Sequence, residues 1–445
     1  MSKMIRWSIV IVAVLALVVS AGLGQDQKPP TLDAAKKQAV IEEVSKLLNR
    51  GYIFAETAKK MEEALRARLK NGDFDKLSAA PEFAQAVSRV LAEVSKDGHI
   101  GFQYNPAVAA DIRRLESQSE EEAGKVRERR LQEARRNNFG FRKVERLAGN
   151  IGYVDFRMFA TPDQAGETAI AAMTFLAYCD AVIVDLRQNG GGDPAQIQLI
   201  STYFFDEPVH LNDLYARELD RTENYWTLPY VPGPRAAGAD LYILTSRRTF
   251  SGAEEFTYNM KNLKRATVIG ETTGGGAHPT GTRIVQQYFL LRVPFARAIN
   301  PVSKTNWEGT GVEPDIACPA AEAFDRAYAM AVEKLAAKAA DPGRKAEYDW
   351  ISAEAKAKMS KAFVDEKTLM LYTGEYGERK VTFESGALFY QRTGPKYKLV
   401  PMTETLFAVE GLDYFRVEFT VEAGRAVALV GLYDDGRREP SPRTK

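Results

Sequence analysis

Residues 180–192, DAVIVDLRQNGGG, combine an apolar run with a glycine turn and decide the fold class. The run Ala181–Val184 is apolar without alternation, which is typical of a strand covered on both faces of a sheet. Similar runs follow at 239–246 (ADLYILTS) and 266–271 (ATVIGE), and helical patterns separate them. This strand–helix–strand order predicts an α/β domain with a largely parallel sheet over residues 140–345.

The regions before and after this domain differ from it in hydrophobic periodicity, charge and glycine content. Apolar positions between 33 and 94 repeat with helical spacing in three segments, which predicts an N-terminal helical bundle over 25–110. Residues 111–139 are mostly charged, so we expect an exposed helix or a flexible connector. Residues 346–445 begin with a helical linker and continue as short strands punctuated by glycine, such as GERKVTFESG (377–386), which predicts a small all-β C-terminal domain.

The first 24 residues have the pattern of a signal peptide. Lys3 and Arg6 precede an apolar run from Ile9 to Val19, and Gly22 and Gly24 supply small residues for cleavage. The run is too short to span a bilayer comfortably. We therefore expect a mature protein that begins near Gln25, has no stable membrane anchor and is periplasmic or secreted.

Charge and cysteine content exclude several classes of protein. The chain has 60 basic and 59 acidic residues, and this balance gives no indication of a nucleic-acid partner. Cys179 and Cys318 are the two cysteines, too few for a disulfide framework or a cysteine metal site. We expect two buried free thiols.

Two short segments follow predicted strands and have alternative interpretations. Gly190–Gly192 can form a phosphate-binding loop, an oxyanion-binding loop or a tight turn, although the segment lacks the Lys-Ser/Thr pair of a phosphate loop. In TFSGAEEF (249–256), Ser251 and Glu254 have the spacing of a helix capping box. The same Ser251 would also stand at the C-terminal end of a parallel strand and at the positive end of a helix, where a nucleophile is well placed.

An activated serine usually needs a base and a group that orients the base. His99, in DGHIGF (97–102), follows a glycine turn, and His278, in GETTGGGAHP (270–279), is the rival base. His210 lies in an unremarkable polar stretch and receives no role. Glu308, in NWEGTGVEPD (306–315), has two interpretations, a carboxylate that orients an imidazole and an ordinary exposed loop residue.

Taken together, these motifs resemble the tricorn-like and C-terminal-processing serine peptidases, which include the modules of interphotoreceptor retinoid-binding protein. The resemblance covers roughly residues 35–335 and rests on the order of separate motifs, which are YIFAETAKKM (52–61), SKDGHIGFQY (95–104), VIVDLRQNGGG (182–192), TSRRTFSGAEEF (245–256), VIGETTGGGAHP (268–279) and EGTGVEPDI (308–316). It implies a crotonase-like (ClpP-like) α/β core.

The resemblance also implies site residues. Ser251 corresponds to the nucleophile, His99 to the base and Glu308 to the residue that orients it, while Gly191 and Gly252 offer amides to an oxyanion. His278 is the alternative base or a substrate-binding residue. Processing peptidases use a lysine base in a G-K-G segment, and here Gly275 and Gly276 stand at that place. This chain therefore looks like the tricorn-like branch.

The sequence as a whole predicts an exported serine peptidase that acts on peptides or proteins through a Ser-His-Glu site. Neither a metal nor a cofactor is expected in this reaction, and a homo-oligomer is compatible with the sequence. The alternative is a non-catalytic protein of the same fold that binds hydrophobic ligands or peptides in an apolar cleft, as the retinoid-binding modules do.

Overall fold

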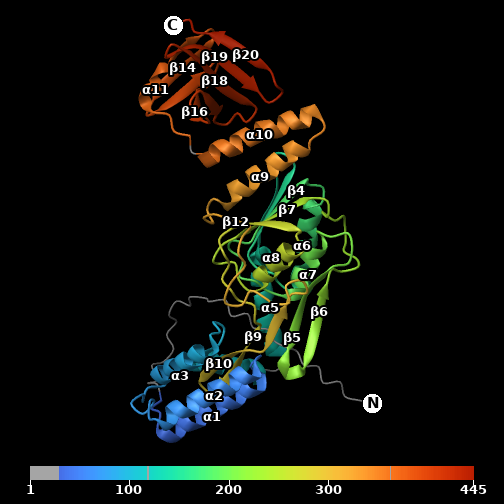
Figure 1. Cartoon of the computed structure of the whole chain (residues 1–445), viewed down its shortest axis with the longest axis vertical. Coiled ribbons are helices and arrows are strands. Elements are labelled where there is room, and N and C mark those ends of the chain that lie inside the picture. Colours follow the sequence, from blue (N-terminus) through green and yellow to red (C-terminus); the bar gives the residue numbers. More distant parts are fainter. Residues whose placement is uncertain (1–29, 118–119, 361) are drawn as a thin grey trace.

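A computed structural model describes residues 30–117, 120–360 and 362–445 of the chain. The molecule is elongated, with a helical bundle at one end, an α/β part in the middle and a β domain at the other end (Figure 1). The predicted signal peptide lies outside the described residues. Every helix in the described part of the chain is too short or too polar to cross a lipid bilayer.

Three amphipathic helices form the N-terminal bundle, as the spacing of apolar residues predicts. They are α1 (Ala34–Gly51), α2 (Ala55–Lys70) and α3 (Ala80–Ser95). The bundle packs on an antiparallel sheet whose strands are distant in sequence, β1 (Gly101–Tyr104), β10 (Phe289–Pro294) and β9 (Thr280–Val285). Phe289 and Leu291 enter the core of the bundle, so the loop after α3 is held against the middle of the molecule.

The charged segment that follows is helical where it is described. It contains most of α4 (Pro106–Ser117) and all of α5 (Glu120–Arg136). Of the two alternatives for this segment, the structure therefore has the exposed helix. A short 3-10 turn (Asn138–Gly140) leads from α5 into the central sheet.

The central sheet has six strands in the order β12-β8-β7-β4-β3-β2. All neighbouring pairs are parallel except β2–β3, which confirms the largely parallel sheet. The strands are β2 (Phe141–Leu147), β3 (Ile151–Phe156), β4 (Ala181–Asp185), β7 (Asp240–Thr245), β8 (Ala266–Gly270) and β12 (Ile316–Ala317).

Helices cover both faces of this sheet, which explains the unbroken apolar run in β4. Val182 and Val184 point to the face covered by α6 (Pro162–Leu176), α7 (Pro194–Thr202) and α8 (Gly252–Asn262). Ala181 and Ile183 point to the opposite face, which α9 (Ala323–Lys338) and α10 (Pro342–Ser360) cover. Both cysteines are free, but only Cys179 is buried, whereas Cys318 is half-buried because it lies on the loop after the short edge strand β12.

A long hairpin links the middle of the molecule to the bundle. Its strands β5 (His210–Ala216) and β6 (Arg221–Trp226) form an antiparallel sheet with β11 (Ala296–Ile299). At the tip, in a 3-10 turn (Arg217–Leu219), the Arg217 guanidinium donates hydrogen bonds to the carbonyls of Tyr52 (2.6 Å) and Asn49 (2.8 Å).

The C-terminal domain is an antiparallel meander with a core of its own, as the glycine-punctuated strands predict. Thr444 N–H donates to the Glu375 carbonyl (2.8 Å), and Glu375 N–H donates to the Lys445 carbonyl (3.0 Å), so the chain end closes the sheet on its first strand. Its elements are α11 (Glu366–Leu371), β13 (Gly374–Tyr376), β14 (Arg379–Glu384), β15 (Ala387–Gln391), β16 (Tyr397–Pro401), β17 (Leu406–Val409), β18 (Phe415–Glu422), β19 (Arg425–Tyr433) and β20 (Arg438–Pro442).

Candidate active site

Three loops meet at the C-terminal edge of the central sheet. They follow β4, β7 and β8, which are neighbours in the sheet and parallel to one another. Phe250 N–H donates to the Asn189 carbonyl (3.1 Å), and Gly274 N–H donates to the Thr249 carbonyl (3.0 Å), so the middle loop is joined to both others. Open α/β sheets carry their functional sites at this edge.

Ser251 occupies a strained turn between β7 and α8. Its backbone angles are φ 52° and ψ −122°, a conformation that residues with a Cβ rarely adopt. Such a strand-to-helix turn exposes a side chain at the top of a sheet, and it is the conformation of the serine in nucleophile elbows. The next residue, Gly252, is the first of α8, so Ser251 also stands at the positive end of the helix dipole.

Glu254 holds the Ser251 turn, as the capping interpretation predicts. Its carboxylate accepts the Ser251 N–H (2.8 Å) and also the N–H groups of Gly275 (2.7 Å) and Gly276 (2.8 Å) and the hydroxyl of Thr273. Burial raises the pKa of Glu254, although these hydrogen bonds act in the opposite direction. One buried carboxylate therefore fixes the Ser251 turn against the glycine loop that follows β8.

The triple-glycine loop lies directly against Ser251 and Gly252. A Cβ on Gly191 would fall 2.8 Å from the Ser251 Cβ and 2.5 Å from the Gly252 nitrogen, so only glycine fits there. The Gly191 N–H, however, donates to the Asn189 side chain (2.8 Å). Among the described residues no hydrogen bond engages the N–H of Gly192 or of Gly252. The Gly192 and Gly252 amides are close to one another, since a Cβ on Gly252 would fall 2.9 Å from the Gly192 nitrogen.

His99 and Glu308 come together from positions 209 residues apart in the sequence. His99 lies in the turn between α3 and β1, and Glu308 lies in the loop after β11; His99 Nδ1 and Glu308 Oε1 are 2.9 Å apart. The other Glu308 oxygen accepts the N–H groups of Ala277 (2.7 Å) and His278 (3.2 Å). Burial alone would lower the pKa of His99, but the hydrogen bonds to Asp97 and Glu308 outweigh it and raise the pKa to about 9.

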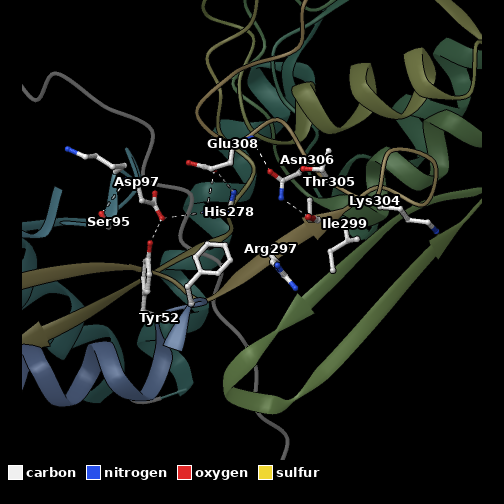
Figure 2. Close-up of a pocket in the computed structure, with 13 residues that line it drawn as sticks. Tyr52, Ser95, Asp97, His278, Arg297, Ile299, Lys304, Thr305, Asn306 and Glu308 are labelled. Carbon is white, nitrogen blue, oxygen red and sulfur yellow. Dashed lines mark hydrogen bonds and ion pairs between the residues drawn. The ribbon is translucent and has the colours of Figure 1, made fainter. Parts of the chain in front are cut away.

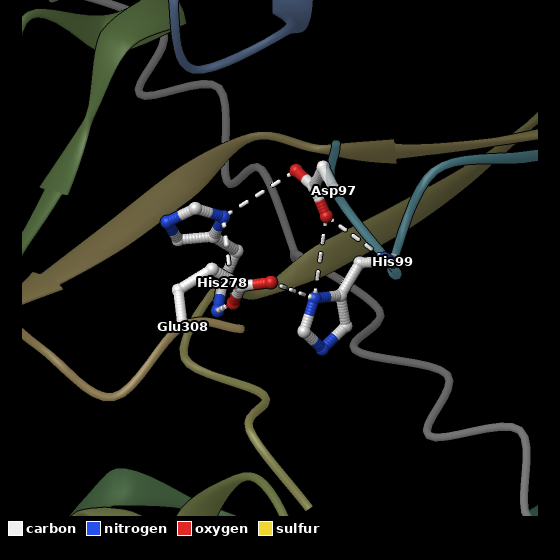
Figure 3. A group of neighbouring side chains, drawn as sticks. All are labelled: Asp97, His99, His278 and Glu308. Atoms are coloured by element: carbon white, nitrogen blue, oxygen red, sulfur yellow. Dashed lines mark hydrogen bonds and ion pairs between the residues drawn. The ribbon is translucent and has the colours of Figure 1, made fainter. Parts of the chain in front are cut away.

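Asp97 and His278 extend this pair into a cluster (Figure 3). Asp97 accepts the His99 N–H (2.8 Å) and the Tyr52 hydroxyl (3.0 Å), and it lies 3.4 Å from His278 Nδ1. Burial alone would raise the pKa of Asp97, but its hydrogen bonds to His278 and His99 hold the pKa well below the usual range. Both nitrogens that face the carboxylates are Nδ1, so His99 Nε2 is directed away from them.

His99 Nε2 lies next to the Ser251 turn. A Cβ on Gly276 would fall 2.7 Å from His99 Nε2, and the N–H groups of Gly276 and Ser251 share one oxygen of Glu254. The ring of Phe250, adjacent to Ser251, packs on the His99 ring with centroids 5.5 Å apart. Within the described residues no hydrogen bond joins Ser251 to His99 or to His278. In a free enzyme such bonds are often long and tighten when substrate binds.

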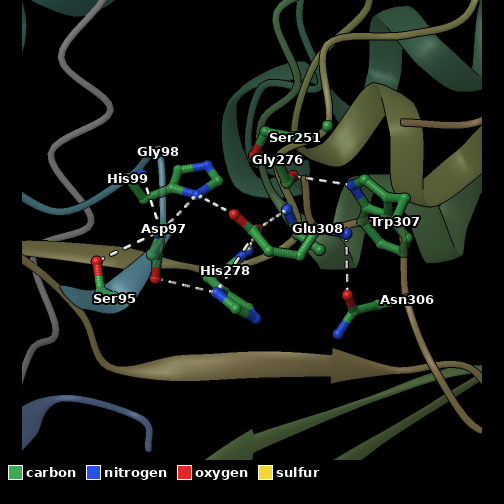
Figure 4. A network of polar contacts seen from close by, with 12 residues as sticks. Ser95, Asp97, Gly98, His99, Ser251, Gly276, His278, Asn306, Trp307 and Glu308 are labelled. Carbon is green, nitrogen blue, oxygen red and sulfur yellow. Dashed lines mark hydrogen bonds and ion pairs between the residues drawn. The ribbon is translucent and has the colours of Figure 1, made fainter. Parts of the chain in front are cut away.

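Trp307 orders the loop that carries Glu308. Its buried indole N–H donates to the Gly276 carbonyl (2.9 Å), and the Asn306 side chain accepts the Glu308 N–H (3.0 Å) (Figure 4). The loop after β8, which carries Gly276, is thereby tied to the loop that carries Glu308.

A pocket of about 340 Å³ opens beside the cluster (Figure 2). Asp97, His278 and Glu308 form its inner wall, while Ser251 and His99 are not among its lining residues. Tyr52 and Phe54 add aromatic surface. The pocket therefore reaches the carboxylates rather than the serine.

Several residues that build this site were not predicted from the sequence. Asp97 stands two residues before His99, and an Asp-Gly-His turn is a local signal that points to it. Tyr52 and Trp307 give no such signal, since aromatic residues at these positions are equally typical of a core. His210 lies elsewhere, where it pairs with Asp213 (2.7 Å) and stacks on Trp226.

Comparison with known proteins agrees with the motifs. Residues 150–318 match the model of peptidase family S41, and residues 32–137 match the N-terminal domain of this family in eukaryotic IRBP. The chain belongs to peptidase family S41. Over 103 residues this S41 chain is 32% identical to the tail-specific protease of Haemophilus influenzae strain Rd. The match covers 22% of the chain and 13% of that relative.

Solved structures similar to the S41 chain include three peptidases. The photosystem II D1 C-terminal processing protease is 15% identical, over 64% of this chain and 93% of that one, with a TM-score of 0.45. A putative peptidase from Parabacteroides merdae is 19% identical over 64% and 90%, also with a TM-score of 0.45. The tricorn protease is 14% identical over 65% and 35%, with a TM-score of 0.39.

Proposed function

We propose that this S41 chain is an exported serine peptidase in which Ser251 is the nucleophile, His99 the base and Glu308 the residue that orients the base. The observation that carries the proposal is the 2.9 Å hydrogen bond from His99 Nδ1 to Glu308, on a ring whose Nε2 lies beside the strained Ser251 turn. Export rests on the signal-peptide pattern of residues 1–24, and we assign the central domain to the crotonase-like fold.

The reaction follows from these positions. His99 Nε2 takes the proton of the Ser251 hydroxyl while Oγ attacks the carbonyl carbon of the peptide bond. Glu308 and Asp97 stabilise the imidazolium that forms, since both lie at Nδ1. The imidazolium then gives its proton to the leaving amine. Water attacks the acyl-enzyme in the same way, with His99 taking a proton from the water and returning it to Ser251 Oγ as the acid product leaves.

The negative charge of the tetrahedral intermediate needs donors beside Ser251. We assign the N–H of Gly252, at the start of α8, and the N–H of Gly192, because the Gly191 N–H is engaged by Asn189. One such donor contributes on the order of 3 kcal/mol to transition-state stabilisation.

Replacing the nucleophile tests the proposal directly. Ser251→Ala should abolish labelling by a serine-directed phosphonate and lower peptide cleavage by on the order of 10⁴-fold or more. Ser360→Ala, at the exposed end of α10, is the matched control and should behave as the wild type. Full activity in Ser251→Ala would refute the assignment of Ser251.

The alternative function is that of a non-catalytic binder of hydrophobic ligands or peptides. One observation favours it, since no hydrogen bond connects Ser251 to a histidine in the described chain and Phe250 packs against the His99 ring. A binder should take up an apolar ligand in the pocket beside Tyr52 and Phe54 without reacting with the phosphonate. Covalent labelling of Ser251 would exclude this alternative.

A further inference from the structure

Four side chains direct possible metal-ligand atoms toward one another (Figure 3). The atoms belong to Asp97, His99, His278 and Glu308, and they all lie within 4.8 Å of one another. His99 Nδ1 is 2.9 Å from Glu308 and 3.4 Å from Asp97, and His278 Nδ1 is 3.4 Å from Asp97 and 3.5 Å from Glu308.

These separations are close to those of a tetrahedral zinc site. Ligands about 2.0–2.1 Å from a tetrahedral ion are about 3.3–3.4 Å apart. Three of the four nitrogen–oxygen separations are within a few tenths of an ångström of this value. The two histidines face different oxygens of each carboxylate, so binding of one ion requires both carboxylates to turn and the 2.9 Å contact to lengthen. One ligand atom from each of the four residues already lies within 4.8 Å of the other three. Two imidazoles with two carboxylates are also a donor set that suits zinc better than calcium or magnesium, which prefer oxygen.

The proposed mechanism does not use the whole of this cluster. His99 is the base and Glu308 and Asp97 lie at its Nδ1, but His278 has no role in peptide cleavage. Both carboxylates are sheltered, since the Asp97 side chain is 4% exposed and that of Glu308 is 16% exposed. Among the described residues their ion-pair partners are the two histidines alone. Lys96, Arg297 and Lys304 line the same pocket without pairing with either carboxylate.

We propose that Asp97, His99, His278 and Glu308 bind one divalent zinc ion, and that the bound ion switches off the Ser251–His99 pair. The ion takes no part in peptide cleavage. A neutral imidazole bound to metal through Nδ1 carries its proton on Nε2, so the His99 nitrogen beside Ser251 cannot accept a proton. The pocket gives the ion a route from solvent to Asp97, His278 and Glu308. The inhibitory half of this inference rests on the proposed function, whereas the metal site does not.

The site is tested with the full mature chain and zinc chloride alone. After equilibrium dialysis, metal analysis should find one zinc per chain in the wild type and in Ser251→Ala, and Co²⁺ in place of zinc should give the visible absorption of a tetrahedral centre. His278→Gln and Asp97→Asn should lose this ion. His210→Gln is the matched control, because His210 pairs with Asp213 outside the cluster, and should retain it.

Two outcomes would overturn the metal site. Zinc stoichiometry that is equal in wild type, His278→Gln and Asp97→Asn would place the ion elsewhere, and a wild type without zinc would remove the site. Circular dichroism establishes that each variant folds, and Glu308→Gln replaces any variant that does not.

Zinc should also slow phosphonate labelling of Ser251 at least tenfold, and a chelator should restore the original rate. Binding without slower labelling would refute the inhibitory role alone, and absent labelling in metal-free protein would refute the proposed function instead.

Discussion

At the scale of single residues, Gly276 sets the space between His99 and the Ser251 turn. A Cβ at this position would lie 2.7 Å from His99 Nε2 and 2.3 Å from the Phe250 ring. We expect Gly276→Ala to displace both rings and to lower kcat/KM by about 100-fold, because small misplacements of catalytic groups have effects of this size. Steady-state kinetics with a peptide substrate measure this fall in kcat/KM. Gly98→Ala, where a Cβ meets nothing within 4 Å, should retain most activity; equal losses in both variants would contradict the argument.

Glu255 makes the stability of the protein depend on pH. Glu255 lies on α8 and is 5% exposed. Its pKa is raised from 4.5 to about 7, mainly by burial. The Asn212 side chain lowers this pKa, and the charge of nearby Asp193 raises it. Tyr225, on β6, also faces this carboxyl group. The pKa of Glu255 is higher in the folded protein than in the unfolded chain. The contribution of the protonated Glu255 side chain to the free energy of unfolding is therefore complete below pH 4.5 and is lost as pH rises through 7.

Replacing the carboxyl group of Glu255 should therefore remove this pH dependence. Relative to wild type, Glu255→Gln should gain on the order of 2–3 kcal/mol in free energy of unfolding between pH 5 and pH 8. Urea denaturation at both pH values, followed by tryptophan fluorescence, measures the difference. The exposed Glu404→Gln serves as the control and should follow the wild type. The same pH dependence in Glu255→Gln as in wild type would show that another group titrates.

At the scale of elements, Glu254 joins the start of α8 to the loop after β8. Four donors converge on this carboxylate, and a glutamine offers one acceptor oxygen in place of two. We expect Glu254→Gln to leave some of these donors unsatisfied, at about 1–3 kcal/mol each, and to free the loop. Hydrogen exchange at pH 7 should accelerate at the amides of Gly275 and Gly276. Glu255→Gln should leave that exchange unchanged, and unchanged exchange in Glu254→Gln would refute the role of the carboxylate.

At the scale of the whole molecule, local patterns in the sequence predicted the elements but not the contacts between distant segments. The run Ala181–Val184 predicted a doubly covered strand because its residues pack alternately on two helical layers. Polar strands such as β6 escaped prediction because their side chains are mostly exposed and do not alternate. Closure of the C-terminal sheet depends on Glu375 meeting Thr444, a pairing that no local pattern contains.

In the candidate site too, the sequence predicted the residues but not the backbone geometry that distant contacts impose. The order of the motifs around His99, Ser251 and Glu308 predicted which loops meet, and the structure brings His99 and Glu308 into contact. The positive φ of Ser251 and the engagement of the Gly191 amide by Asn189 are consequences of packing between loops. Backbone direction of this kind is set by tertiary contacts, and the type of residue alone does not reveal it.

The C-terminal domain follows α10 in the chain, and the buried Arg416 makes several of the described contacts between the two. The Arg416 guanidinium lies 3.7 Å from the centre of the Trp350 ring and donates to the Trp350 carbonyl (2.7 Å), and Trp350 N–H donates to the Asp413 carbonyl (3.0 Å). A desolvated cation–π contact contributes about 2 kcal/mol. Since the domain has a core of its own, loss of this contact should loosen the junction without unfolding either part.

Arg416→Ala should therefore increase the radius of gyration measured by small-angle X-ray scattering, because the C-terminal domain gains freedom relative to α10. Phosphonate labelling of Ser251 should keep its wild-type rate, since the residues around Ser251 belong to a separate core. Arg437→Ala removes a solvent-exposed cation–π contact, with Tyr433 at 4.5 Å, that lies wholly inside the C-terminal domain, and it should leave the radius of gyration unchanged. An unchanged radius in Arg416→Ala would mean that other contacts hold the junction, and slower labelling would mean that the C-terminal domain acts on the active site.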